Sequence, residues 1–125
     1  RYSDAHNALS QVYLELGRFR EAVEEAKVAL SNVLYGSQHL ALRNMAIALH
    51  RQGKTKEALG RLREAIQFQS NFCLAYLDMG KIFRDKGERE SSISMLSEAI
   101  RRCPRRREKL VTTVFWWPPL SATKK

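Results

Sequence analysis

The residue types that could do chemistry are few in this sequence, and they lie far apart. None of the three histidines, His6, His39 and His50, pairs with a second ligand at the spacing of a metal site. The sequence contains no glycine-rich phosphate loop, no G-x-S-x-G turn and no H-E-x-x-H motif. We therefore expect neither an enzyme nor a bound cofactor or metal. His6 is expected to pack between helices as a core residue.

Cys73 and Cys103 are the only cysteines, too few for a disulfide-rich miniprotein or a four-cysteine zinc module. If the segment between them forms an antiparallel helical hairpin, both cysteines come to the same end of it. A bridge also demands a defined sulfur geometry, which nothing in the sequence sets. A disulfide between them is therefore conceivable but not set by the sequence, and the redox state of both cysteines and the redox compartment stay open.

Positive charge is concentrated at one end of the chain. Lys and Arg total 22 against 13 Asp and Glu, which gives a formal charge of +9. Residues 101–125 hold eight of the positive charges against Glu108 alone, whereas residues 1–100 are nearly balanced, with 14 positive and 12 negative charges. A strongly basic chain suggests nucleic acid or an anionic membrane as a partner, but here the excess of positive charge lies in the tail alone.

Length and composition predict one small globular domain. The chain has 125 residues, of which 44% are hydrophobic, too many for a disordered chain. No apolar run approaches the roughly 18 to 20 residues that a membrane span needs. Because the sequence opens on Arg1 with neither Met nor a signal peptide, we expect a fragment or a processed product of a longer protein.

A repeat organises the first hundred residues. Gly17, Gly53 and Gly87 are 36 and 34 residues apart, and each is followed by a small residue after five positions and by an alanine after twelve. The apolar residues between these positions form the stripe of an amphipathic helix, and a second helical stripe precedes each glycine. Because glycine suits a helix end and small residues allow close helix packing, each unit is predicted as helix, glycine turn, helix.

The pattern resembles the tetratricopeptide repeat family. The family motif W-x₂-L-G-x₂-Y…A-x₃-F…P is met most fully in the third unit, by Tyr76, Met79, Gly80, Phe83, Ser92, Leu96 and Pro104. No unit has the tryptophan, and only the third has the terminal proline. The resemblance implies an all-α, right-handed α-solenoid of three repeats, at about 3–36, 39–72 and 73–106, followed by a basic and aromatic tail at 107–125.

Two extra residues enter between the first and second units. The segment contains Asn32, Val33, Leu34 and Tyr35, and it is similar to an Asn-Pro-Leu-Tyr run in the pilotin lipoproteins of type IV pili. That resemblance implies a bacterial factor that assists the assembly of an outer-membrane secretin, located at the periplasmic face of the outer membrane. The alternative is a plain spacer loop, which many repeat proteins have, and a cytoplasmic location.

In this family the first helices of the repeats line a concave groove, so the resemblance implies a peptide-binding surface. Apolar residues with a basic rim there would suit an acidic segment of a partner. The predicted groove residues are Arg43, Ile47, His50, Arg51, Leu74, Leu77, Lys81 and Arg84. Chaperone-binding members clamp a carboxylate with Lys and Asn on the first helix, but Asn7 and Gln11 occupy those places and only Asn44 agrees. Binding of a chaperone C-terminus is therefore disfavoured.

The tail after Pro104 breaks the pattern. Its Phe115, Trp116 and Trp117 favour an extended chain, and Pro118-Pro119 would stop a helix. The sequence therefore predicts a non-catalytic scaffold that binds a protein or peptide segment. Two alternatives are nucleic-acid binding through the tail, which lacks a recognised module around it, and a homo-oligomer formed by tail exchange.

Overall fold

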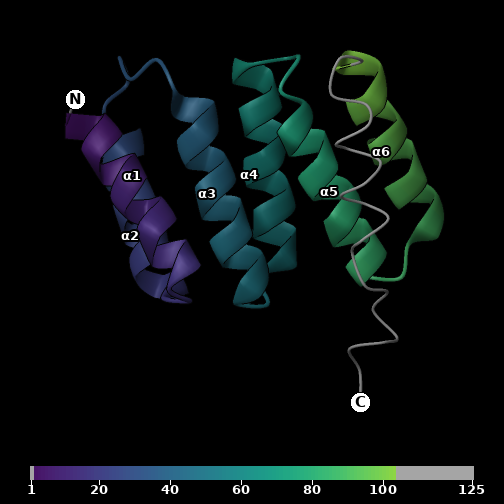
Figure 1. Ribbon diagram of the computed structural model, residues 1–125, viewed down its shortest axis with the longest axis horizontal. Coiled ribbons are helices and arrows are strands. Elements are labelled where there is room, and N and C mark those ends of the chain that lie inside the picture. The colour runs from purple at the N-terminus through teal and green to yellow at the C-terminus, as the bar shows by residue number, and fades with distance from the viewer. Residues whose placement is uncertain (1, 104–125) are drawn as a thin grey trace. The chain divides into compact units, whose positions relative to one another are not determined.

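The computed structural model describes residues 2–103, which form helices and turns without a strand (Figure 1). The six helices are α1 (Tyr2–Glu15), α2 (Phe19–Leu30), α3 (Gln38–Arg51), α4 (Thr55–Phe68), α5 (Cys73–Asp85) and α6 (Arg89–Arg102). They pair as three hairpins, α1–α2, α3–α4 and α5–α6, which confirms the predicted all-α class. None of these six helices is long and apolar enough to cross a membrane. The predicted tail, 107–125, lies outside the described residues.

Each hairpin turns at the glycine that the repeat predicted. The φ angles are 76°, 86° and 83°, in the left-handed region that favours glycine, at Gly17, Gly53 and Gly87. In the first turn the Gly17 amide donates to the Leu14 carbonyl at 3.1 Å, and the Arg18 amide donates to the Tyr13 carbonyl at 2.8 Å. This pair of bonds satisfies carbonyls at the helix end, and it recurs at the other two glycines.

Small residues let the two helices of each hairpin approach closely. The predicted alanines of the second helices are at most 1% exposed: Ala22, Ala29, Ala58, Ala65 and Ala99. In the first hairpin the Ser10 hydroxyl donates to the Ala22 carbonyl at 2.7 Å. In the third hairpin the Ser92 hydroxyl donates to the Gly80 carbonyl at 2.8 Å. Both bonds join the helices where they cross.

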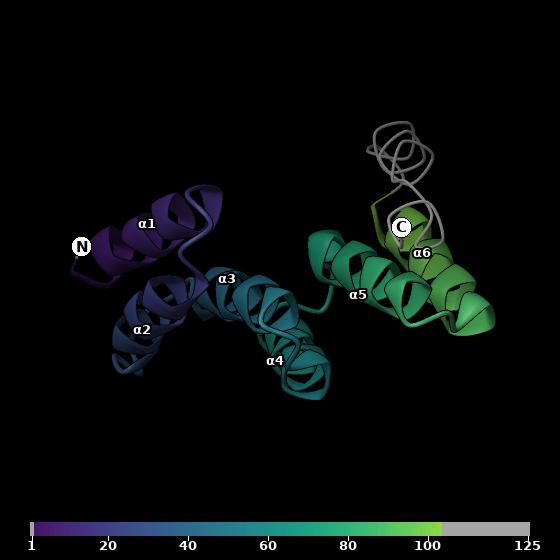
Figure 2. The ribbon, with the colours of Figure 1, turned by 90° about the horizontal axis from the view of Figure 1, so that it is seen from below.

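The described chain divides into two compact units, Arg1–Ser70 and a second unit that begins at Asn71. In the first unit, α2 packs on α3 and α1 also contacts α3, so that the four helices α1 to α4 share one core (Figure 2). Its largest buried side chains come from α3 and α4: Leu42, Met45, Leu49, Leu59 and Leu62. Burial of this apolar stripe is what stabilises hairpins that cannot fold alone.

The second unit contains the α5–α6 hairpin, which is closed by a covalent bond. Cys73 opens α5, Cys103 follows directly after α6, and the two form a disulfide with their Cα atoms 6.0 Å apart. The structure thus contains the bridge that the sequence left open. Antiparallel pairing places the first residue of α5 beside the end of α6, and the packing of the hairpin supplies the geometry that the sequence did not set.

The segment between α2 and α3 contains the two extra residues. Asn32 organises it, because the Asn32 side chain accepts a bond from the Leu34 amide at 3.1 Å and its carbonyl accepts one from the Gln38 side chain at 2.8 Å. Val33 and Leu34 are 85% and 88% exposed. The segment thus has an ordered backbone with two apolar side chains on its surface.

Candidate ligand-binding surface

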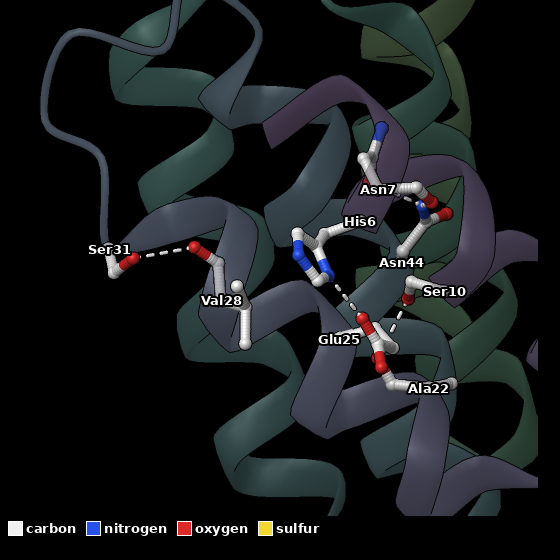
Figure 3. A network of polar contacts seen from close by, with 8 residues as sticks. All are labelled: His6, Asn7, Ser10, Ala22, Glu25, Val28, Ser31 and Asn44. Carbon is white, nitrogen blue, oxygen red and sulfur yellow. Dashed lines mark hydrogen bonds and ion pairs between the residues drawn. The ribbon is translucent and has the colours of Figure 1, made fainter. Parts of the chain in front are cut away.

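A polar pair joins the first helices of the first two repeats within the first unit (Figure 3). Asn44 of α3 is 7% exposed and donates from Nδ2 to Asn7 Oδ1 of α1 at 2.8 Å, with a longer bond of 3.4 Å to the Asn7 backbone carbonyl. A buried amide without a partner would cost free energy, so this bond favours one alignment of α1 beside α3. Both residues stand at the positions compared above with the carboxylate clamp, and here they contact one another.

Tyr35 belongs to the same region of the first unit. Burial raises the pKa of the Tyr35 hydroxyl, and a hydrogen bond to Asp4 raises it further, against the opposing effect of hydrogen bonds with Asn7 and Ser37. Because these partners include two α1 residues, the segment before α3 closes on the first turns of α1. From the sequence, this segment was either a spacer loop or a pilotin-like run, and neither interpretation included its contact with α1.

Two predicted groove residues lie on α3 beside this pair. Arg43 and Ile47 are both half-buried and flank Asn44 on the same helical face, while Leu40, one turn before, is 39% exposed. We call Leu40, Arg43 and Ile47 the α3 surface. It combines apolar area with one guanidinium, next to the amides of Asn7 and Asn44.

The other two predicted residues of α3 make contacts near its C-terminal end. The His50 ring nitrogen Nδ1 lies 3.2 Å from the Thr55 hydroxyl in a hydrogen bond. The Arg51 guanidinium lies over the Phe19 ring, 5.7 Å from its centroid. Thr55 begins α4, and Phe19 begins α2. Both side chains therefore link α3 to a neighbouring helix, and we leave them out of the α3 surface.

On α5, in the second unit, three of the four predicted residues are partly exposed and one is buried. Leu74, Lys81 and Arg84 are half-buried and share one face of the helix, whereas Leu77 is only 4% exposed. Leu77 is thus a core side chain and not the exposed apolar contact that we expected. Burial lowers the pKa of the Arg84 guanidinium, which lies 3.8 Å from the Asp85 carboxylate.

An open hollow of about 340 Å³ lies among α2, α3 and α4 of the first unit. Val23, Met45 and Leu49 contribute its apolar lining. The lining also includes four cations and two carboxylates: Arg20, Lys27, Lys54, Arg61, Glu24 and Glu57. Sequence reasoning missed this hollow because its lining comes from three helices. Its charges are of both signs, with cations in excess.

No group of three His, Cys, Asp or Glu side chains in residues 2–103 is placed to hold a metal ion. His6, expected in the core, has a side chain 25% exposed and bonds through Nδ1 to the Glu25 carboxylate at 2.5 Å (Figure 3). His6 therefore links α1 to α2. At the start of α3, burial lowers the pKa of His39.

Comparison with known proteins gives a family and a fold. Models described as tetratricopeptide repeat match residues 3–31, 40–69 and 74–106, which together exceed half of the chain. The crystal structure of MamA is similar, with a TM-score of 0.71 and 17% sequence identity. That match covers 85% of this chain and 61% of the MamA chain, and at this identity it shows an all-α solenoid fold alone. No curated protein matches the sequence.

Proposed function

The chain belongs to the tetratricopeptide repeat family, whose repeats support protein–protein interaction, and we propose that its first unit binds a peptide or protein segment beside α1 and α3. The fold is typically a non-catalytic scaffold. The binding surface in this proposal consists of the α3 surface together with Asn7 and Asn44. A partner protein, rather than a small molecule, is the class of ligand.

The observation that carries this proposal is the bond between Asn44 and Asn7. A carboxamide has two N–H donors and a carbonyl acceptor, which is the same chemistry as a peptide group. Asn44 is buried and bonded to Asn7, so it holds the half-buried Asn7 side chain in place, and the Asn7 carboxamide can bond to the backbone of a bound segment. Leu40 and Ile47 would provide apolar contact, and Arg43 would orient an acidic side chain or a terminal carboxylate of the partner.

The second unit offers a smaller set of the same kind. Leu74, Lys81 and Arg84 share one face of α5 and combine an apolar side chain with two cations. We include them as a separate contact set for an acidic segment. Leu77 is excluded because its side chain is buried.

A charge reversal tests the binding surface. Arg43→Glu should weaken the capture of an acidic peptide by about tenfold or more, since placing like charges together at an interface costs several kcal/mol. The matched control is Arg63→Glu, an exposed arginine of α4 on a second helix. Binding to an array of acidic and of basic peptides, measured by fluorescence anisotropy, reports the effect. Equal loss in both variants, or unchanged binding by Arg43→Glu, would contradict the proposal.

A narrower form of the proposal names the partner as an outer-membrane secretin, with the chain acting as a pilotin-like factor at the periplasmic face of that membrane. It rests on the resemblance of the segment from Asn32 to Tyr35, and the exposure of Val33 and Leu34 supports it. The test is capture of secretin segments by wild type, Val33→Asp and Arg43→Glu. Failure of all secretin segments, with acidic peptides still bound, would reject this form and keep the broader one.

The two alternatives rest on residues 105–125, outside the described part of the chain. Nucleic-acid binding through that tail predicts a salt-sensitive affinity for RNA or DNA that deletion of the tail removes. Tail exchange predicts a dimer that the same deletion converts to a monomer. Light scattering and anisotropy on the two proteins distinguish these outcomes.

A further inference from the structure

The hollow among α2, α3 and α4 is a different surface of the first unit from the α3 surface. Figure 2 shows α2 and α4 on either side of α3. On α3 the hollow is lined by Met45 and Leu49. At about 3.6 residues per turn, these two side chains leave the helix on the face opposite to Leu40, Arg43 and Ile47. The hollow can therefore hold a ligand of its own.

The apolar part of the hollow presents little surface to such a ligand. Val23, Met45 and Leu49 are only 7%, 4% and 6% exposed. The volume of about 340 Å³ lies at the lower end of the range for small-ligand sites, roughly 300 to 1,000 Å³. The hollow is thus suited to a small polar or charged group held by its polar lining.

Three donor side chains of this lining lie at one end of the hollow. Arg20 is the second residue of α2, and Gln52 and Lys54 lie in the turn between α3 and α4. These segments are neighbours, because the Arg51 guanidinium at the end of α3 lies over the ring of Phe19, the first residue of α2. This end of the hollow therefore has a guanidinium, a carboxamide and an ammonium, all exposed to solvent.

Within residues 2–103, none of these three side chains has a hydrogen-bond or ion-pair partner. Glu24 lies one turn from Arg20, at a spacing where ion pairs form on helices, yet the two are not paired. By contrast, Arg18 bonds to Glu21 at 2.8 Å just before the same stretch of α2. The donors of Arg20 and Lys54 thus remain available to a ligand.

We propose that this end of the hollow binds a phosphate group. A phosphate monoester has three strong acceptor oxygens and carries about −1.5 to −2 charge at neutral pH. The guanidinium fork of Arg20 matches two of those oxygens, Lys54 adds a point charge, and the Gln52 amide donates to the third oxygen. A carboxylate has one charge and two oxygens, so it would satisfy fewer of these donors.

The remaining charges of the hollow support the same choice. Its four cations outnumber its two carboxylates, and Coulomb attraction grows with the charge of the ligand, so a dianion is favoured over a carboxylate. At the other end Arg61 already pairs with Glu64 at 2.7 Å, which leaves Lys27 as the unpaired cation there. We therefore place the phosphate beside Arg20 and Lys54.

Two sources supply such a group: a phosphorylated side chain of a partner, and free inorganic phosphate. Titrating the isotope-labelled full chain with a glycine-flanked phosphoserine peptide, and separately with inorganic phosphate, distinguishes them by NMR. Tighter binding of the peptide assigns a phosphorylated partner, and equal or tighter binding of the ion assigns free phosphate. The affinity should be on the order of 1 mM, because exposed ion pairs are individually weak.

The positions of the NMR shifts test the site directly. The backbone amides of Arg20, Gln52 and Lys54 should shift, while those of Arg43 and Ile47 on the opposite face of α3 should not. Arg43→Glu should accordingly leave phosphate binding unchanged. This variant also separates the proposal from peptide binding at the α3 surface, because either one can fail without the other.

A double substitution removes the two cations. Arg20→Gln with Lys54→Gln should weaken phosphate binding by about tenfold. The matched control, Lys56→Gln with Arg63→Gln, removes the same charge from exposed positions of α4 outside the hollow, and it should change the affinity by less than about twofold. All four positions are exposed, so both proteins should keep the wild-type circular dichroism.

A second double substitution should act in the opposite direction. Glu24→Gln with Glu57→Gln removes the two carboxylates of the hollow, so phosphate should bind about fivefold more tightly. A folding defect would not strengthen binding. A peptide with glutamate in place of phosphoserine should bind wild type about tenfold more weakly than the phosphorylated one.

Four results would overturn the proposal. The first is the absence of shifts at the amides of Arg20, Gln52 and Lys54 with both probes. The second is equal weakening by the two variants that remove cations, which would show a general effect of net charge. The third is equal affinity for the glutamate and phosphoserine peptides. The fourth is loss of phosphate binding in Arg43→Glu, which would place the anion on the opposite face of α3.

Discussion

The first and third hairpins solve the same packing problem with different groups. Where α1 crosses α2, Ser10 of the first helix donates to the carbonyl of Ala22. Where α5 crosses α6, the hydroxyl belongs to the second helix, as Ser92, and it donates to Gly80 at the position equivalent to Ser10. The repeat thus constrains the size of the two residues at the crossing, while the helix that supplies the hydroxyl is free to change.

The third hairpin has two further features that the first lacks. Its ends are joined by the bond between Cys73 and Cys103. At its crossing, a Cβ atom on Gly80 would lie 2.7 Å from the Leu96 side chain, so a larger residue there would force Leu96 to shift. The first hairpin instead has packing partners beyond itself, because α3 contacts both of its helices. Among the described residues of its unit, 71–103, the third hairpin has no further helix beside it, and the disulfide and the close crossing are its local links.

Removing the disulfide should give the largest change in the stability of the second unit relative to the first. Cross-linking residues 30 positions apart restricts the unfolded chain, which is worth about 3 to 4 kcal/mol by loop-closure entropy. Reduction should therefore raise hydrogen exchange in α5 and α6 and leave α1 to α4 nearly unchanged. The variant Cys73→Ala with Cys103→Ala is the control, because it should no longer respond to reductant. Equal changes in hydrogen exchange in both units would contradict the assignment of the disulfide's effect to the second unit.

Filling the space at Gly80 should have the next largest effect. Gly80→Val should destabilise the α5–α6 hairpin by about 2 kcal/mol, because overpacking a close crossing typically costs 1 to 3 kcal/mol. Chemical denaturation measures the change in the free energy of unfolding. In a Leu96→Ala background the same substitution should cost less, because the atoms that would clash are gone. Additive losses would show that Leu96 is not the obstacle.

Removing either hydroxyl should give a smaller loss. Ser10→Ala and Ser92→Ala should each lower the free energy of unfolding by about 1 kcal/mol, the usual net contribution of one hydrogen bond. The middle hairpin already has alanine at both equivalent positions, Ala46 and Ala58, so alanine fits there. A loss from one serine only would mean that the two crossings are not equivalent.

The smallest expected effect is a pH dependence in the middle hairpin. Burial favours the neutral imidazole of His39, so its pKa in the folded chain lies below the usual 6.5. The unfolded chain then binds more protons as pH falls, and stability that is complete above pH 6.5 declines as pH drops from there through the lower folded value. Thermal unfolding at pH 7.5 and 5.5 measures this, and His39→Gln should reduce the difference.

Local features of the fold followed directly from the sequence. The three glycines predicted the turns, and the apolar stripes predicted the paired helices, because helix periodicity and left-handed backbone are properties of a few neighbouring residues. The candidate surface was less predictable. Arg43 and Ile47 lie where their helix face suggested, but the burial of Leu77 and the contacts of His50 and Arg51 depend on neighbours far along the chain.

The sequence by itself determined the family, the helical repeat and the residues that must be small or left-handed, because each is written in spacings within one repeat. Tertiary structure decided which of those residues meet. Cys73 reaches Cys103 across 30 positions, and Asn44 reaches Asn7 across 37. Such outcomes depend on distances in space, which become defined only when the helices pack.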